Sequence, residues 1–570
     1  MKSQIELWLS RDPDPQTRAE LEALIVSEEW SEIEQRFAQR LQFGTAGLRG
    51  EVGVGPNRMN RLVIQETALG LGNYLLQQIP DAAQRGIIIG YDGRLLSKQF
   101  AYDTAAVMTA LNIRVYLTET VSPTPTIAFG INQLNTAAGV VVTASHNPPQ
   151  DNGFKVYWQN GAQIIAPHDG GIAAAIDVAA QSEIPLCDLD DAQAKGLLSW
   201  LSQAFFDDYQ EMVLENLHQP ACQDKFAVAY TPMHGVGANI AEALAEKQGL
   251  CQLYSVPSQR EPDGTFPTVT FPNPEEPGAM DRVIQLAQEI GADYAIANDP
   301  DADRFAIAIR TPQNQFRMLT GDQVGLLLAD HILTASKTSG WVGNTIVSSR
   351  MLEKIANHHQ ANYYQTLTGF KWLANVAMDK RSQALPFLFA YEEALGYAIG
   401  QHVWDKDGLN AMVNFIELIH LLHGNNQTVW DKLAQLYQQH GLHFTTQKSI
   451  RLAPGTPAVG DKLRSAPPVK IAGLQVVTRM DYKTGHATSI DGSVTEISLP
   501  KSDVLIYLLE DESRIIVRPS GTEPKLKCYY ERITPLASAD QFWTAQTEAQ
   551  QQMEQLIERH QIDLNNLFNG

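Results

Sequence analysis

Cysteine is scarce in this 570-residue chain, which has four cysteines: Cys187, Cys222, Cys251 and Cys528. They are scattered and form no CxxC pair, so neither a disulfide framework nor a cysteine zinc site is expected. The chain also lacks an apolar segment near the roughly 18 residues of a membrane span, and its first residues lack the charged head and apolar middle of a signal peptide. These absences predict a cytoplasmic protein with reduced thiols and no membrane partner.

The chain also has fewer basic than acidic residues. The chain has 43 Lys and Arg against 64 Asp and Glu, which gives a formal net charge of −21 at pH 7. This excess of negative charge disfavours a nucleic-acid partner, and no basic run interrupts it. The motifs GxxxxGK[ST] and GxSxG are absent too, which disfavours a P-loop kinase and an α/β-hydrolase.

The length of the chain and its pattern of apolar residues predict several domains. At roughly 100–200 residues per domain, three to five are expected. Strand candidates alternate with helical stretches in three cycles, which is typical of α/β units with mixed or largely parallel sheets. The first 40 residues are expected to form short amphipathic helices. We predict three related α/β domains and a smaller C-terminal α+β domain, with boundaries at 1–208, 209–321, 322–445 and 446–570.

Three aspartates occupy alternate positions in "NDPDADRF". Asp299, Asp301 and Asp303 follow an apolar strand candidate, and in an extended or turning segment their carboxylates can converge on one point. Three oxygen ligands suit a hard divalent cation such as Mg²⁺, and an EF-hand is excluded because its sixth position would hold Arg304 instead of glycine. A solvated acidic turn is the alternative, which we disfavour because three adjacent carboxylates repel one another without a cation.

Two glycine-containing loops are candidate anion sites. The segment "RPSGTEPK" runs from Arg518 to Lys525 after the strand candidate "RIIV". Its backbone N–H groups can face a phosphate, and Arg518 can bind one through two parallel hydrogen bonds. A plain turn is the alternative. The segment "FGTAGLRG", with Thr45, Gly47 and Arg49, offers the same possibility more weakly.

Two further loops carry charged side chains. In "YEEALGY", Glu392 and Glu393 follow a buried strand candidate, where carboxylates can accept hydrogen bonds from sugar hydroxyls. A helix N-terminus, which favours acidic residues, explains this pair equally well. In "WDKDG", Lys406 lies in a charged turn, where a solvated lysine is the default.

A single serine, Ser145, stands where the β-branched run "VVVT" meets the loop "ASHNPP". A hydrolytic triad needs a base within reach of the hydroxyl, but His146 is expected on the other face of an extended segment. Because a cation site and two anion sites are predicted elsewhere, Ser145 could instead carry a phosphoryl group as a covalent phosphoenzyme. A capping or turn hydroxyl is the alternative.

The four loops together resemble those of the α-D-phosphohexomutase superfamily, over nearly the whole chain after about residue 40. "TASHNPPQDNGFK" resembles its phosphoserine loop, "NDPDADR" its metal loop, "YEEALGY" its sugar loop and "RPSGTEPK" its phosphate loop. The resemblance implies four domains around a central cleft. It also implies an enzyme that moves phosphate between O6 and O1 of a hexose such as glucose or mannose, through a bisphosphorylated sugar that reorients without leaving.

The resemblance also implies roles for individual residues. Ser145 would carry phosphate and join the three aspartates in binding Mg²⁺, and Lys155 would act as general acid or base through an ammonium of lowered pKa. Arg49, His146 and Arg304 complete the implied catalytic set. The residues implied to contact the sugar are Glu392, Glu393, Ala394 and Lys406, and those implied to hold the non-reacting phosphate are Arg518, Ser520, Gly521, Thr522 and Lys525.

One position departs from the family pattern. Many glucose-preferring members carry serine where this chain has Ala394, and "TLTGFKWLAN" resembles the longer branch that includes phosphopentomutase-like and glucose-1,6-bisphosphate synthase-like members. The sugar therefore stays open between glucose, mannose and a pentose. A phosphatase with an aspartate nucleophile and an inactive sugar-phosphate-binding protein are the rival classes. We expect sugar phosphates as the only partners of a monomer or weak dimer.

Overall fold

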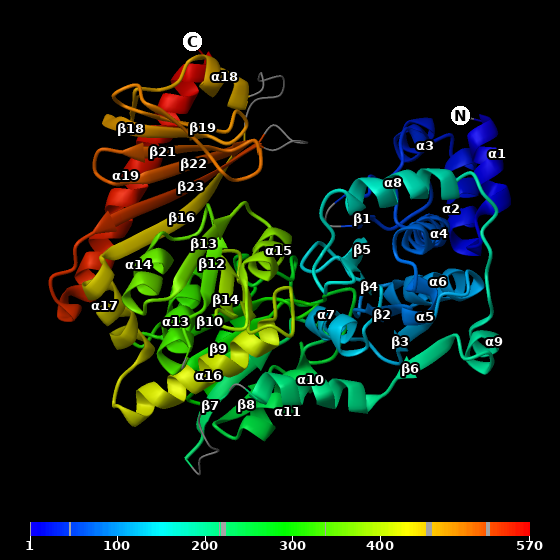
Figure 1. The fold of residues 1–570 in the computed structure, drawn as a ribbon, viewed down its shortest axis with the longest axis horizontal. Coiled ribbons are helices and arrows are strands. Elements are labelled where there is room, and N and C mark those ends of the chain that lie inside the picture. Colours follow the sequence, from blue (N-terminus) through cyan, green and yellow to red (C-terminus); the bar gives the residue numbers. More distant parts are fainter. Residues whose placement is uncertain are drawn as a thin grey trace. The chain divides into compact units, whose positions relative to one another are not determined.

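The computed structural model of the protein describes residues 2–44, 47–215, 217, 224–336, 338–451, 459–519 and 525–569. The chain divides into two compact units. The first comprises Met1–Leu319 and Leu395–Glu417, and the second comprises Thr320–Ala394 and Leu418–Gly570. Figure 1 shows the helices and strands of both units as a ribbon, whose colour follows the sequence from blue at the N-terminus to red at the C-terminus.

Three helices open the first unit, as the amphipathic pattern predicts. They are α1 (Lys2–Arg11), α2 (Pro15–Val26) and α3 (Trp30–Phe37). Proline needs no N–H partner, so Pro15 suits the first position of α2. The Asp14 carboxylate caps this helix by accepting a hydrogen bond from the N–H of Gln16. The sequence "RDPDPQ" therefore ends one helix and starts the next.

The first sheet has six strands in the order β1-β5-β4-β2-β3-β6. Its strands are β1 (Leu48–Glu51), β2 (Ile87–Tyr91), β3 (Val115–Thr118), β4 (Ala138–Val142), β5 (Asp151–Trp158) and β6 (Leu198–Leu201). The strands β4, β2, β3 and β6 are parallel, whereas β5 and β1 are antiparallel to their neighbours. Every residue of β2 and β4 is buried, as expected for apolar runs in a parallel sheet. The helices of this part are α4 (Arg61–Gln78), α5 (Ala82–Arg85), α6 (Ser97–Ala110), α7 (Thr124–Gln133), α8 (His168–Ala179) and α9 (Leu189–Ala194).

The second sheet has five strands in the order β11-β10-β9-β7-β8. Its strands are β7 (Phe226–Thr231), β8 (Cys251–Ser255), β9 (Tyr294–Asn298), β10 (Phe305–Arg310) and β11 (Phe316–Met318). The strands β8, β7 and β9 are parallel, and β10 and β11 are antiparallel to their neighbours. The helices of this part are α10 (Gln203–Glu215), α11 (Ala238–Gln248) and α12 (Asp281–Glu289). The first unit also contains β15 (Gly396–Ile399) and the start of α16 (Gly408–Gly424).

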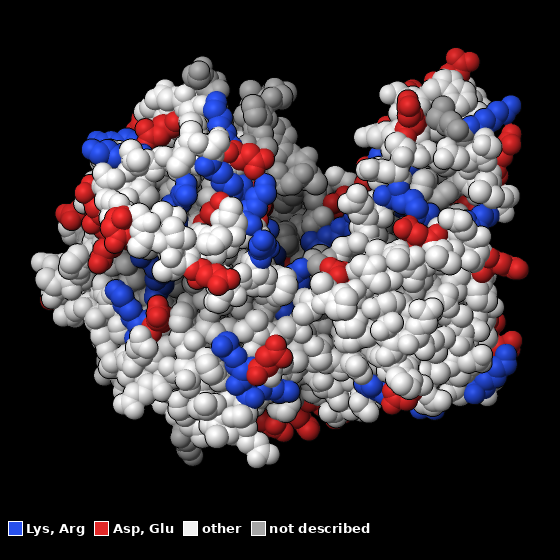
Figure 2. Space-filling model, turned by 45° about the horizontal axis from the view of Figure 1, so that its top comes forward, with Lys and Arg blue, Asp and Glu red and all other residues white. Residues whose placement is uncertain are grey.

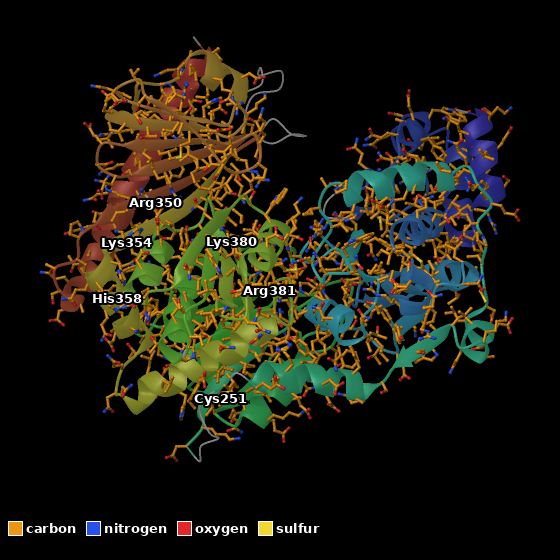
Figure 3. All side chains as sticks on the ribbon, in the orientation of Figure 1. Cys251, Arg350, Lys354, His358, Lys380 and Arg381 are labelled. Carbon is orange, nitrogen blue, oxygen red and sulfur yellow. The ribbon has the colours of Figure 1, made fainter. Side chains whose placement is uncertain are left out.

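A parallel sheet opens the second unit. In it, β12 (Trp341–Thr345) lies between β13 (Asn362–Thr366) and β14 (Phe387–Glu392). The helices of this part are α13 (Gly321–Ala335), α14 (Met351–His358), α15 (Phe370–Lys380) and α17 (Val429–His440). Figure 3 labels Arg350 at the start of α14, followed by Lys354 and His358. Their spacing of four residues places all three along one face of the helix.

The C-terminal part of the second unit is an antiparallel sheet with the strand order β16-β23-β22-β21-β18-β19-β20, and β17 pairs with β18. Its strands are β16 (Leu442–Arg451), β17 (Lys470–Ile471), β18 (Leu474–Asp481), β19 (His486–Ser489), β20 (Val494–Glu496), β21 (Leu505–Leu509), β22 (Arg514–Pro519) and β23 (Lys525–Thr534). Its helices are α18 (Val459–Ser465), the 3₁₀ helix η1 (Ala539–Gln541) and α19 (Phe542–Asn569). The α19 residues Met553, Leu556 and Leu564 are buried in one apolar core with residues of the strands.

The predicted fold class is confirmed, because three α/β parts with mixed or parallel sheets are joined by an α+β part at the C-terminal end. In the described part of the chain, no helix has both the length and the apolar character needed to cross a bilayer. Acidic and basic side chains are interspersed over the face drawn in Figure 2, so the negative charge on that face does not form one patch.

Candidate active site

Ser145 lies in the loop that follows β4, and its backbone conformation is unusual. Its φ of 54° is in the left-handed region, which a non-glycine residue adopts only when its surroundings hold it there. The Ser145 N–H donates a hydrogen bond to Oγ1 of Thr143, with a donor–acceptor distance of 2.8 Å. The serine is buried, with 2% of its surface exposed. The residue is therefore fixed in place at the carboxyl end of a central strand.

The Ser145 hydroxyl has two partners. Its Oγ donates a hydrogen bond to Oδ2 of Asp299 over 2.9 Å, and it lies 3.0 Å from Nδ1 of His146. The expectation that His146 points to the opposite face is therefore wrong. Alternation of faces holds for extended backbone, and the left-handed turn at Ser145 brings the adjacent side chains together.

His146 is nevertheless a poor base. Burial first, and then the positive charges of Arg304 and Arg49, lower its pKa to about 2. An imidazole with this pKa takes up a proton only weakly, so a serine–histidine relay of the hydrolase type is not supported. Arg49 itself is exposed on β1, where it is paired across the strands with Gly153 of β5.

The three aspartates lie together between β9 and β10. Asp299, Asp301 and Asp303 are buried, and their ligand oxygens lie within 4.8 Å of one another. Burial first, and then the charges of the other two carboxylates, raise the pKa of Asp299. Oδ1 of Asp301 and Oδ1 of Asp303 are buried without a hydrogen-bond partner. Buried carboxylate oxygens without donors are costly, and an all-oxygen set suits a hard divalent cation, so these residues could hold a metal ion.

Two neighbouring segments support this aspartate loop, and neither was identified from the sequence. Thr124, the first residue of α7, donates from its N–H to the Asp301 carbonyl over 2.9 Å and from Oγ1 to Asp301 Oδ2 over 2.6 Å. On another side, a Cβ built on Gly235 would lie 2.3 Å from Cα of Pro300. Glycine is therefore required for this close approach of two backbones.

Lys155 reaches the aspartates from β5. Its Nζ lies 2.6 Å from Oδ2 of Asp301 and 2.9 Å from Oδ2 of Asp303, and the side chain is 3% exposed. Burial acts to lower its pKa, but the two carboxylates outweigh burial and raise it. The expected lowering of the Lys155 pKa is therefore wrong in this arrangement, in which the side chain is a firmly protonated ammonium.

Lys406 is also paired rather than solvated. Its Nζ lies 3.2 Å from Oδ2 of Asp303 and 3.4 Å from Oδ1 of Asp405. The Tyr157 hydroxyl on β5 donates a hydrogen bond to Oδ2 of Asp405 over 2.6 Å, which anchors the lysine loop. Arg304 stands at the edge of the cluster, with Nε 3.9 Å from Oδ2 of Asp299. The first unit thus brings the serine, the three aspartates, the histidine and these cations into one buried cluster.

The predicted sugar loop belongs to the second unit. Glu392 ends β14, and Glu393 and Ala394 form the following turn, so the alternative of a helix N-terminus is wrong. Oε2 of Glu393 accepts a hydrogen bond from Oγ of Ser348 over 2.9 Å. Burial first, and then the charge of Glu392, raise the pKa of Glu393 to about 8. The raised pKa favours the protonated Glu393 carboxyl, which can donate a hydrogen bond as well as accept one.

The predicted phosphate loop is described only in part. Arg518 is exposed near the end of β22, and Lys525 is the first residue of β23. Ser520, Gly521, Thr522 and the side chain of Lys525 lie outside the described residues. Within the same unit, the pKa of Tyr529 is raised, by burial first and then by the charge of Glu393, and the charge and hydrogen bond of Arg518 only partly oppose this rise. Tyr529 therefore interacts electrostatically with both Glu393 and Arg518.

Comparison with known families defines the class of protein. Profiles described as "Phosphoglucomutase/phosphomannomutase, alpha/beta/alpha domain" I, II and III match residues 40–183, 207–313 and 320–440. The profile of the C-terminal domain matches residues 471–541. These matches define an enzyme of the phosphohexomutase class. The chain belongs to the phosphoglucomutase/phosphomannomutase family.

The relatives of this chain carry names that refer to different sugars. The chain is 39% identical to the probable phosphoribomutase of Schizosaccharomyces pombe over 556 residues, which cover 92% of each chain. It is 38% identical to the probable phosphomannomutase of Haemophilus influenzae over 482 residues, which cover 83% of this chain and 93% of the relative. Among solved structures, parafusin (phosphoglucomutase) from Paramecium matches 93% of this chain and 97% of its own with a TM-score of 0.69. Its sequence identity is 19%, so it supports the fold alone.

Proposed function

We propose that this enzyme moves a phosphoryl group between the terminal hydroxyl and O1 of a sugar phosphate, with Ser145 as the phosphate carrier. The observation that supports this proposal most directly is the hydrogen bond from Ser145 Oγ to Asp299 within the buried aspartate cluster. A hydroxyl placed against a cation site and surrounded by Lys and Arg side chains suits a nucleophile that accepts and returns phosphate.

The reaction has two symmetrical halves. In the first, the bond between Ser145 Oγ and phosphorus breaks while a sugar hydroxyl loses its proton and forms a new bond to phosphorus, which gives a bisphosphorylated sugar. This sugar turns within the site, and Ser145 Oγ then attacks its other phosphate, whose departing sugar oxygen takes up a proton. Lys155 is the proposed proton donor in this second half, because the ammonium is buried beside the aspartates. In the first half the same side chain would accept the proton of the sugar hydroxyl. This requires the neutral amine, and a cation held by Asp301 and Asp303 would favour that form by offsetting the two carboxylate charges that raise the pKa of Lys155. A bisphosphorylated sugar would also restore phosphate to an empty Ser145 and so act as activator.

We propose Mg²⁺ as the cation of the aspartate cluster. Asp299, Asp301 and Asp303 would hold it, with Ser145 beside them. The two unpartnered oxygens, Oδ1 of Asp301 and Oδ1 of Asp303, support this choice, because Mg²⁺ prefers oxygen ligands. When bound, the ion would offset negative charge on the transferring phosphoryl group. His146, Arg49, Arg304 and Lys406 would supply further positive or neutral donors around that phosphate.

The substrate we propose first is a hexose phosphate of glucose or mannose. Glu392, Glu393 and Ala394 would face the sugar, and Ala394 offers no hydroxyl, so discrimination between C2 epimers should be weak. The non-reacting phosphate would be held by Arg518, Ser520, Gly521, Thr522 and Lys525. A pentose phosphate is the second candidate, supported by the 39% identity to the Schizosaccharomyces pombe phosphoribomutase.

Two measurements test this function. A panel of hexose and pentose 1-phosphates should give measurable turnover on at least one, with glucose and mannose 1-phosphate both accepted. Ser145→Ala should lower the rate by at least about 10³-fold, because the covalent relay has no other carrier. The exposed Ser182, in the same part of the first unit, is a matched control, and Ser182→Ala should keep full activity. Near-normal turnover by Ser145→Ala would overturn the mechanism.

The remaining proposals concern the domain boundaries, the cellular location and the assembly state. We propose domain boundaries at 1–208, 209–321, 322–445 and 446–570, since each range includes one of the four sheets or the larger part of it. We also propose a cytoplasmic location, on the basis of the four scattered cysteines, and a monomer or weak dimer. Sedimentation at several concentrations tests the assembly state.

A further inference from the structure

Arg94, which follows β2, grips the backbone of the Ser145 loop. Its Nη2 donates hydrogen bonds to the carbonyl oxygens of Ser145, over 2.7 Å, and of Asn147. Its Nη1 donates to the carbonyl oxygens of Pro148 over 2.8 Å and of Asp151 over 3.0 Å. One buried side chain, 4% exposed, therefore donates hydrogen bonds to four carbonyl groups of a single loop.

The guanidinium is itself held from two sides. Nε lies 3.5 Å from Oδ2 of Asp92, and Oδ1 of Asp92 accepts hydrogen bonds from the Arg94 N–H and from Oγ of Ser97. The ring of Phe266 lies against the guanidinium, with 4.9 Å from Cζ to the ring centroid. The four carbonyl groups use the four N–H groups on Nη1 and Nη2 of the planar guanidinium, which the single nitrogen of lysine, with three donors, cannot replace.

The hydrogen bonds from Arg94 act on Ser145, the residue with the strained backbone conformation. Ser145 has a φ of 54°, and such a conformation persists only where neighbouring groups over-determine it. Thr143 fixes the Ser145 N–H, and Arg94 fixes the Ser145 carbonyl. With both backbone groups fixed, the direction of the Cα–Cβ bond is fixed, and from there Oγ reaches Asp299 through its own hydrogen bond.

We propose that Arg94 is a positioning residue for phosphoryl transfer. It contacts no atom of the Ser145 hydroxyl and acts through the loop backbone, keeping Oγ aimed at Oδ2 of Asp299. The proposal rests on the proposed role of Ser145 as phosphate carrier. Misplacing a reacting atom by about 1 Å can cost about 10²-fold in rate, so the grip of Arg94 has a measurable kinetic consequence.

The test compares Arg94→Lys with Arg85→Lys. Arg85 precedes β2 and also binds backbone carbonyls, those of Asn135 and Thr136, both over 3.0 Å. Arg94→Lys should lower kcat by about 10²-fold while KM for the sugar phosphate changes less than about threefold. Amide hydrogen exchange at residues 144–151 should become faster. Arg85→Lys should leave kcat and exchange in that loop unchanged.

Several results would overturn the proposal. They are wild-type kcat in Arg94→Lys, an equal loss in Arg85→Lys, or a loss of kcat with unchanged exchange at 144–151. If Arg94→Lys does not fold, Arg94→Gln, which keeps two donors, is measured in the same way. Ser145→Ala distinguishes a failure of the proposed function from a failure of the proposal for Arg94. Full activity of Ser145→Ala contradicts the role of Ser145 as phosphate carrier. An inactive Ser145→Ala together with a fully active Arg94→Lys contradicts only the positioning role of Arg94.

Discussion

Removing the Thr124 hydroxyl should weaken the metal site without touching a metal-ligand residue. Oδ2 of Asp301 accepts hydrogen bonds from Thr124 Oγ1 and from Lys155 Nζ, each over 2.6 Å, and this leaves Oδ1 without a partner. Thr124 is fully buried, so water cannot replace its hydroxyl. Thr124→Val keeps the shape of the side chain and removes the donor.

The expected magnitude follows from one charge-assisted hydrogen bond. Such a bond contributes about 1.5–3 kcal/mol, and the loss of a partner that orients a metal ligand lowers metal affinity by about 10- to 100-fold. The Mg²⁺ concentration for half-maximal activity should rise by this factor in Thr124→Val. Direct Mg²⁺ titration by calorimetry should give the same shift.

The conservative variant Thr124→Ser keeps the hydroxyl and serves as control. Its Mg²⁺ dependence should stay within about threefold of the wild type, because the donor to Asp301 is retained. A wild-type Mg²⁺ dependence in Thr124→Val would refute the reasoning. Equal losses in both variants would show that the effect does not depend on the hydroxyl, and would refute the reasoning too.

Three further predictions concern the metal, the sugar and the C-terminal part. Chelation with EDTA should abolish turnover and Mg²⁺ should restore it, while Asp301→Asn should lower Mg²⁺ affinity with little change in melting temperature; full activity after exhaustive chelation would contradict this. Ala394→Ser should shift the ratio of kcat/KM values a few-fold towards glucose 1-phosphate, as expected from a hydrogen bond of roughly 0.5–1.5 kcal/mol; an unchanged ratio would show that the discrimination lies elsewhere. Burial lowers the pKa of His560 to about 4 in the folded protein, against about 6.5 in the unfolded chain. As the pH falls from about 6.5 to about 4, the unfolded chain therefore binds a proton at His560 that the folded protein does not bind. The free energy of unfolding should fall by up to about 3 kcal/mol across that window. His560→Leu should flatten this slope in denaturant titrations, and an identical slope would contradict the assignment.

The parts of the fold that follow from local patterns were predictable from the sequence. The apolar run before Ser145 predicts a buried strand, and β4 occupies Ala138–Val142. The alternate spacing of Asp299, Asp301 and Asp303 predicts convergent carboxylates, and the structure places their oxygens within 4.8 Å. In both cases neighbours in the chain are also neighbours in space.

The details that depend on distant residues were not predictable. The contact between Ser145 and His146 needs a positive φ at Ser145, whose carbonyl oxygen accepts a hydrogen bond from Arg94, 51 positions away. The raised pKa of Lys155 needs Asp301, which is 146 positions away. Arg94 and Thr124 do follow strands, in "YDGR" and "SPTPT", and polar residues in loops after strands are the only signal that could have pointed to them.

The most direct test of the central claim is the chemical location of the phosphate. The purified enzyme is incubated with a labelled bisphosphorylated hexose, digested, and the labelled peptide is sequenced by mass spectrometry. We predict about 80 Da of added mass, one phosphoryl group, on Ser145 in an acid-stable serine ester. Label on an aspartate of the 299–303 loop, or no covalent label in an active enzyme, would contradict the role of Ser145 as phosphate carrier.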